Sequence, residues 1–123
     1  SSITSCAGTF TDSGGNSANY GDDVRELTVI EPVNASSVTM TFNSFDVEFE
    51  WDYMYVYDGN SVWAPLIGYY TGTTNPGTIT SSGGALAIEF RSDCATNNAG
   101  WEATWTCSTV LSPPANLQAT GTR

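Results

Sequence analysis

The sequence predicts an all-β domain, built as an antiparallel sandwich or a barrel, with no significant helix. Apolar and polar residues alternate with a period of two in several short stretches, which is the pattern of strands with one buried face. Turn-forming Gly, Pro, Asn and Asp residues separate these stretches, and no window of about a dozen residues keeps a helical period. The 123 residues suffice for one domain with a hydrophobic core.

The strands can be assigned in chain order from this alternation. Residues 38–42 alternate Val, Met and Phe with two Thr, so the apolar side chains face a core and the hydroxyls face water. Residues 53–57 alternate Tyr with Met and Val, and the same pattern returns in residues 86–91 and 101–106. We therefore expect eight to ten short strands. Turn signals lie between them at residues 58–60, 75–77 and 82–84.

The composition excludes most classes of enzyme and two classes of partner. Asp and Glu number 13 against 3 Lys plus Arg, a formal net charge of −10, so the surface would repel nucleic acid and anionic lipid. The chain has no His and no Lys, which excludes Ser-His-Asp and Cys-His catalysis, imidazole-bound zinc, Schiff-base lysines and phosphate-loop lysines. No apolar run approaches the ~20 residues of a membrane-spanning helix.

Four carboxylates gather in one short segment, at Asp46, Glu48, Glu50 and Asp52. If this segment is extended, the last three share one face, because side chains alternate along a strand. Such carboxylates repel one another unless water solvates them or a hard cation bridges them. The residues alone leave two interpretations open, a cation site and a solvated acidic edge that discourages strand addition. A glycosidase pair, Glu48 with Asp52 or Asp93, is disfavoured because nothing else indicates a sugar cleft.

A series of short motifs together resembles a CUB domain, and especially the bacterial CUB modules of secreted multidomain proteins. The motifs are CAGTFTDSGG at 6–15, NY at 19–20, FNSFDVE at 42–48, DYMYVYDG at 52–59, FRSD at 90–93 and GW at 100–101. The resemblance runs from about Cys6 to Cys107. It implies a two-layer antiparallel β-sandwich, a CUB-like jelly roll, over residues 1–108. It also implies a non-catalytic domain that binds proteins or sugars, commonly beside a protease or another catalytic domain.

The resemblance further implies a calcium site, which one subset of the family carries in loops at one end of the sandwich. It assigns Glu48, Asp52 and Asp93 as carboxylate ligands of Ca²⁺, and Tyr20 as the residue whose hydroxyl holds a ligand carboxylate in place. The loop from Glu48 to Asp52 is shorter than in animal CUB domains, where it usually holds a Cys, and the loop after Asp93 is also short. Further oxygen ligands are expected from that second loop, with Thr96, Asn97 and Asn98 as unranked candidates.

Three cysteines in an acidic chain rich in Ser, Thr, Asn and Gly indicate an oxidising compartment, and hence a secreted or cell-surface protein. Cys6 opens the first strand and Cys107 closes the last. A sandwich can bring those ends together, so we expect a Cys6–Cys107 disulfide. Cys94 is left over, as a buried small hydrophobe or an intermolecular thiol.

Residues 109–123 differ in character from the rest of the chain. The pair Pro113-Pro114 is stiff and extended, as in many linkers between domains. The segment PPANLQAT that contains it resembles the opening strand of a fibronectin type III module. We therefore expect a linker and the start of a following module here.

Two further features concern the surface. Trp63 is a candidate for an exposed ligand surface, whereas the Tyr69-Tyr70 pair is better explained by packing, since one of two neighbours in a strand must face inward. Asn34-Ala35-Ser36 matches the N-glycosylation sequon.

These observations predict a secreted, non-catalytic, calcium-binding module that binds or adheres to a protein or carbohydrate within a larger extracellular protein. Its partner would use a Lys or Arg at the calcium end, and neighbouring domains would flank it in the full-length chain. Two alternatives keep the fold and change the role. One is an accessory domain of a secreted peptidase or other hydrolase, and the other is a repeating subunit of an extracellular surface structure or fibre.

Overall fold

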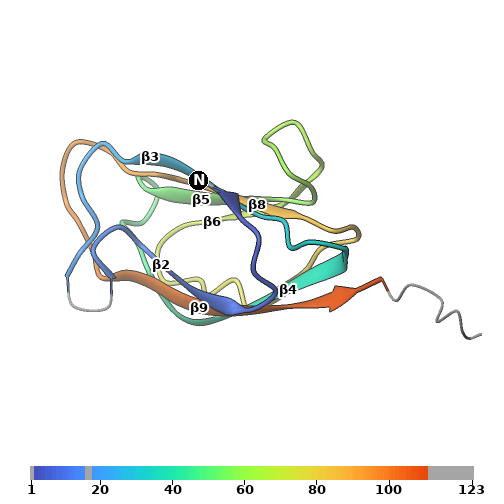
Figure 1. Ribbon diagram of the computed structural model, residues 1–123. Helices are drawn as coiled ribbons and strands as arrows, with labels where there is room; N and C mark the ends of the chain where they lie inside the picture. The colour runs from blue at the N-terminus through green and yellow to red at the C-terminus, as the bar shows by residue number, and fades with distance from the viewer. Residues whose placement is uncertain (1, 16–17, 111–123) are drawn as a thin grey trace, which may run out of the picture.

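Nine strands form two facing sheets in the part of the chain that the structure describes, residues 2–15 and 18–110 of a computed structural model. One sheet has the strand order β1-β3-β8-β5-β6 and the other the order β2-β9-β4-β7. Figure 1 shows the two sheets as layers lying face to face. The strands are β1 (Ser2–Ile3), β2 (Gly8–Thr11), β3 (Arg25–Ile30), β4 (Ala35–Asp46), β5 (Tyr53–Tyr57), β6 (Leu66–Tyr70), β7 (Thr78–Thr80), β8 (Leu86–Arg91) and β9 (Gly100–Thr109).

The two-layer all-β fold predicted from the sequence is confirmed. Neighbouring strands run antiparallel, with the exception of the two-residue strand β1, which pairs parallel to β3. No segment of the described residues forms an α-helix, and none could therefore cross a membrane as one.

The core lies between the sheets and is formed by the apolar members of the alternating stretches. On β4, Val38, Met40 and Phe42 are buried, whereas the hydroxyls of Thr39 and Thr41 lie on the outer side and bond to threonines of β7. Burying one such apolar side chain contributes about 1.5 to 3 kcal/mol relative to exposure. The period-two pattern that predicted these strands is therefore also what drives the sheets together.

The strand register places several loops at one end of the sandwich. Asp46 at the end of β4 pairs with Gly100 at the start of β9, and Tyr53 at the start of β5 pairs with Arg91 at the end of β8. One short loop joins β4 to β5, so both pairs lie at the same end. The β4–β5 loop and the loop after β8 consequently meet there.

The predicted disulfide is confirmed, since Cys6 and Cys107 are bonded with their Cα atoms 5.0 Å apart. Cys94 is a free cysteine in an exposed bend after β8, so the expectation that it is a buried hydrophobe was wrong. Its role as an intermolecular thiol stays a prediction. Strand β9 runs to Thr109, one residue beyond the predicted domain end, and most of the predicted linker and fibronectin-like segment, from residue 111 on, lies outside the described residues.

Candidate metal centre

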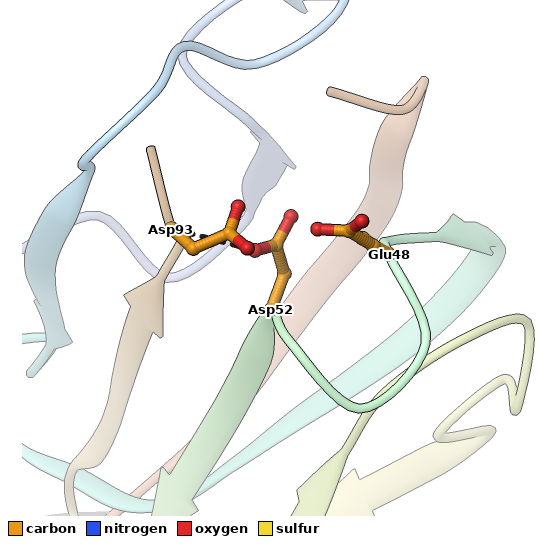
Figure 2. A group of neighbouring side chains, drawn as sticks. All are labelled: Glu48, Asp52 and Asp93. Atoms are coloured by element: carbon orange, nitrogen blue, oxygen red, sulfur yellow. Dashed lines mark hydrogen bonds between the residues drawn. The ribbon is translucent and has the colours of Figure 1, made fainter. Parts of the chain in front are cut away.

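Three carboxylates converge at the end of the sandwich that the loops share. Glu48 and Asp52 stand at the two ends of the β4–β5 loop, and Asp93 follows β8. One oxygen from each lies within 4.8 Å of the others. Figure 2 shows the three side chains pointing toward one another, two from the β4–β5 loop and one from the segment after β8. The structure thus brings together the three residues that the resemblance assigned as ligands.

Asp52 is the fixed centre of this cluster. It is fully buried, and both of its carboxylate oxygens accept hydrogen bonds. The Tyr20 hydroxyl donates to Oδ2 at 2.5 Å, and the backbone N–H of Asp93 donates to Oδ1 at 2.9 Å. One bond therefore fixes the carboxylate, and the other ties the loop after β8 to it.

The hydroxyl of Tyr20 holds both ends of the β4–β5 loop. Its side chain is buried, packs edge-on against Phe90 with ring centroids 4.9 Å apart, and accepts a hydrogen bond from the backbone N–H of Glu48 at 3.0 Å. Burial, reinforced by the bond to Asp52, raises the pKa of the Tyr20 hydroxyl far above its ordinary value of 10.0. The phenol stays protonated and can act as the donor that the sequence analysis assigned to it.

The β4–β5 loop is a tight turn and not the extended segment that the sequence analysis considered for the acidic run. The Glu48 carbonyl accepts the N–H of Asp52 at 3.0 Å, and Glu50 has a left-handed backbone with φ of 67°. The Thr71 hydroxyl lies 2.8 Å from the Asp52 carbonyl and accepts the N–H of Glu50 at 2.8 Å. Glu50 is consequently exposed and outside the cluster, so the interpretation in which Glu48, Glu50 and Asp52 share one face was wrong. Asp46, half-buried at the end of β4, is also outside the cluster.

Glu48 has a carboxylate oxygen that is buried without compensation. Its Oε1 atom is buried and has no hydrogen-bond partner among the described residues. Desolvation raises the pKa of its carboxyl above the ordinary value, and the neighbouring Asp93 and Asp52 raise it further. A side-chain hydrogen bond from Thr96 lowers this pKa, but desolvation is the largest contribution. A divalent cation would stabilise the charged form of a carboxylate placed beside two others.

The loop after β8 contributes one further oxygen of this kind. The side-chain Oδ1 of Asn97 is buried without a hydrogen-bond partner among the described residues. Asn98 instead donates from Nδ2 to Asp46 at 3.1 Å, and Thr96 is exposed. Of the three candidates that the sequence could not rank, Asn97 has a buried oxygen without a hydrogen-bond partner among the described residues, and Thr96 lies close enough to Glu48 to lower its pKa through a hydrogen bond.

The donor set fits a hard divalent cation. The grouped atoms are carboxylate oxygens, with an amide oxygen nearby in sequence to Asp93, and neither nitrogen nor sulfur is among them. Oxygen-only sets with several carboxylates suit Ca²⁺, which takes six to eight oxygen ligands, whereas zinc prefers His and Cys. The chain has no His, and its free Cys94 is outside the group.

The matches with known proteins agree with this fold. A family model described as the CUB domain matches residues 2–105. The chain belongs to the CUB domain family. It is 35% identical over 117 residues to cubilin of Sus scrofa, a match that covers 81% of this chain and 3% of the relative. The chain thus spans a small fraction of the curated relatives it matches.

Solved CUB structures superpose well on the sandwich. The CUB1-EGF-CUB2 fragment of human MASP-1/3 gives a TM-score of 0.76 at 23% identity, covering 88% of this chain and 41% of that one. The MASP-1 CUB2 domain bound to Ca²⁺ gives 0.70 at 26% identity, covering 85% of this chain and 96% of that one. The expectation of a bacterial type of CUB module finds no support here, because the named relatives are animal proteins.

Sequence reasoning missed two aromatic side chains beside the cluster. Phe49 and Trp51 alternate with the acidic residues of the β4–β5 loop and are 63% and 67% exposed. The sequence did contain a signal for their exposure, since large apolar residues that alternate with carboxylates in a short loop cannot all be buried. Trp63, the predicted exposed aromatic, is 92% exposed in the loop between β5 and β6.

Proposed function

We propose that this domain binds one Ca²⁺ ion through Glu48, Asp52 and Asp93 and uses the same end of the sandwich to bind a partner protein. The observation that carries the proposal is the buried Oε1 of Glu48, which lies within a cluster of three carboxylates and has no hydrogen-bond partner in the described part of the chain. Three ionised carboxylates in such proximity repel one another, and a divalent cation is the simplest group that removes the repulsion. The Asn97 amide oxygen and backbone carbonyls or waters would complete the ligand shell.

A bound ion would order the loops rather than build them. Asp52 is already held by Tyr20 and by the Asp93 backbone, so the ion meets a partly organised site. The Ca²⁺-bound MASP-1 CUB2 domain, with its 26% identity, supports the choice of ion. With Ca²⁺ bound, three carboxylates and one divalent cation leave a formal charge of −1, which suits a Lys or Arg of the partner.

The exposed aromatics favour a protein as the partner. Phe49 and Trp51 lie on the loop whose ends are Glu48 and Asp52, and aromatic side chains are enriched in the centres of protein interfaces. A partner segment with a cationic residue beside an apolar one would match both parts of this surface. Carbohydrate binding has no comparable support, and Trp63 remains a predicted ligand surface on the strength of its exposure alone.

The wider context follows from the relatives. Cubilin and the MASP fragments are longer chains in which the matched region is one part, so we propose that this CUB domain is a non-catalytic module of a larger extracellular protein, with residues 109–123 leading to the next module. The disulfide agrees with an extracellular location. The alternatives remain an accessory domain of a secreted hydrolase and a repeating unit of a surface structure.

Calorimetric titration of chelator-treated protein with CaCl₂ tests the ion. We expect one ion per chain and at least about ten-fold weaker binding after Glu48→Gln or Asp93→Asn. Glu50→Gln removes the same charge from an exposed position in the same loop and should change affinity by less than about two-fold. Absence of binding at millimolar Ca²⁺, or an equal loss in Glu50→Gln and Glu48→Gln, would overturn the site.

The partner surface can be tested with a minimal peptide. In the presence of Ca²⁺, acetyl-Leu-Lys-Leu-amide should shift the NMR signals of residues 47–52, and the same peptide with acetylated lysine should not. Shifts that persist in EDTA, or that do not depend on the lysine charge, would contradict a calcium-dependent cation site.

A further inference from the structure

The outer face of the five-stranded sheet carries a second cluster, separate from the carboxylates. Tyr53, Tyr55 and Tyr69 contact one another on this face, with ring centroids 6.0 to 6.3 Å apart. Tyr55 and Tyr69 are register partners of β5 and β6, and the intervening residues of β5, Met54 and Val56, are fully buried in the core. The three tyrosines therefore lie on the side of the sheet that faces away from the sandwich.

Two arginines extend this cluster across the sheet, and one carboxylate holds both. Arg91 Nη2 lies 3.0 Å from Glu89 Oε1, and Arg25 Nε lies 3.7 Å from Glu89 Oε2. The Arg91 guanidinium also stands over the Tyr55 ring, 5.3 Å from its centroid. The Glu89 side chain is 9% exposed, whereas those of Arg25 and Arg91 are 69% and 45% exposed. The Glu89 carboxylate is thus occupied by ion pairs within the protein, whereas the guanidinium groups of Arg25 and Arg91 remain accessible to a partner.

We define the tyrosine face as Tyr53, Tyr55 and Tyr69 together with Arg25 and Arg91. The two arginines and Glu89 sum to a formal charge of +1, on a chain whose net charge is −10 and which has only 3 Lys plus Arg. Salt screens charges that lie more than about 8 Å away at physiological ionic strength. Two nearer carboxylates point elsewhere, Glu26 to the opposite side of β3, where it lies near Thr28, and Asp93 into the carboxylate cluster. A partner docked on the tyrosine face therefore meets side chains whose charges sum to +1. One carboxylate from the partner would complement it.

The tyrosine face also has the composition and rigidity of an interface centre. Tyr and Arg are enriched among the residues that dominate binding energy at protein interfaces. The ion pairs to Glu89, the stacking of Arg91 and the ring contacts already restrict these side chains, so little side-chain freedom remains to be lost on binding. Edge strand β6 continues the face with exposed Leu66 and Ile67.

We propose that the tyrosine face binds an apolar segment of a partner protein that presents a single Asp or Glu to Arg25 and Arg91. A glycan is disfavoured, because the ring planes are inclined by 28°, 37° and 53° to one another and form no flat floor for sugar rings. A polyanion is disfavoured, because the single positive charge of this face would neutralise only one of its many negative charges. A second copy of this chain is disfavoured because two chains of charge −10 repel each other.

The test uses two peptides that differ by one charge. The probes are acetyl-Val-Leu-Glu-Leu-Val-amide and its Gln counterpart, titrated into the ¹⁵N-labelled 123-residue chain in EDTA, which separates this face from any calcium-dependent binding. We expect signals of β5, β6 and β8 to shift with the Glu peptide, with a dissociation constant of about 1 mM, and the Gln peptide to bind about three-fold more weakly.

Substitutions in the tyrosine face test whether its side chains cause the NMR shifts. Tyr69→Ser should weaken the Glu peptide about five-fold and Arg25→Gln about three-fold, and both residues are exposed enough for the fold to tolerate the change. Val33→Ser is the matched control, since Val33 is 70% exposed in the turn between β3 and β4 and lies outside the face. It should leave binding unchanged.

Four results would overturn the proposal. They are equal binding of the Glu and Gln peptides, shifts confined to the loops around the carboxylate cluster, binding of hexagalacturonate without binding of the Glu peptide, and self-association in sedimentation equilibrium that Tyr69→Ser abolishes. Because the titration is done in EDTA, failure here leaves the calcium site unaffected, and failure of the calcium site leaves this face unaffected.

Discussion

Replacing Tyr20 with Phe should destabilise the metal-free domain by about 2 to 4 kcal/mol. The change removes only the hydroxyl, because Phe keeps the buried ring and its edge contact with Phe90. The lost oxygen donates to Asp52 at 2.5 Å and accepts from the Glu48 backbone at 3.0 Å. A bond to a charged group contributes about 1.5 to 3 kcal/mol and a neutral one about 1 kcal/mol, and both partners would be left inside the protein without replacement.

Urea unfolding followed by tryptophan fluorescence measures this loss, with an unchanged m-value as evidence that only stability has changed. The matched control is Tyr70→Phe. Tyr70 is also partly buried against the core, but its hydroxyl makes no hydrogen bond among the described residues, and burial alone raises its pKa. The control should lose less than about 0.5 kcal/mol. Equal effects of the two substitutions would refute the claim that the Tyr20 hydroxyl holds the two ends of the β4–β5 loop together.

Three further predictions concern pH, the disulfide and the backbone at the site. The pKa of the Glu48 carboxyl is raised above 4.5 in the metal-free fold, so the free energy of unfolding in EDTA should be highest near pH 4.5 and should fall as the pH rises and this carboxyl ionises. With Ca²⁺ the free energy of unfolding should instead rise with pH, because the ion binds the ionised carboxylates. Urea unfolding between pH 4.5 and 7 measures both slopes, and identical slopes with Ca²⁺ and with EDTA would contradict the prediction. Replacing Cys6 and Cys107 by Ser should cost about 4 to 5 kcal/mol in the same assay, because the bond closes a separation of 101 residues, and a loss below about 1 kcal/mol would count against the loop-closure argument. Gly100→Ala should lower the free energy of unfolding by about 2 kcal/mol or more, because Gly100 has φ of 85° and an added Cβ would collide with the buried carboxylate of Asp12. Gly83→Ala is the control, since a Cβ there would meet no atom within 4 Å, and it should be nearly neutral. Equal losses in the two variants would contradict this reasoning.

Much of the fold could be read from the sequence because side-chain direction alternates along every strand. The apolar members of residues 38–42 and 53–57 are buried as that rule requires. The Cys6–Cys107 bond followed from the same reasoning, since the first and last long strands of a sandwich end near each other.

The interior of the loops could not be read in this way. Glu50 has a positive φ, which is uncommon for residues other than Gly and leaves no reliable mark in the sequence. No sequence pattern therefore indicated that the acidic run turns at this residue. The clamp by Thr71 depends on a contact across 19 residues with Asp52, which no local pattern encodes. The difference between Asn97 and its neighbours depends on the burial of a single oxygen atom, which no sequence pattern reveals.

The central claim is that three carboxylates, two from the β4–β5 loop and one from the loop after β8, hold one Ca²⁺ ion. A crystal structure of the chain grown with millimolar CaCl₂, with anomalous data to identify the ion, tests it most directly. We predict one ion at about 2.3 to 2.6 Å from oxygens of Glu48, Asp52 and Asp93. A structure without an ion there, or with Ca²⁺ held only by other acidic residues such as Asp22 and Asp23, would contradict the account.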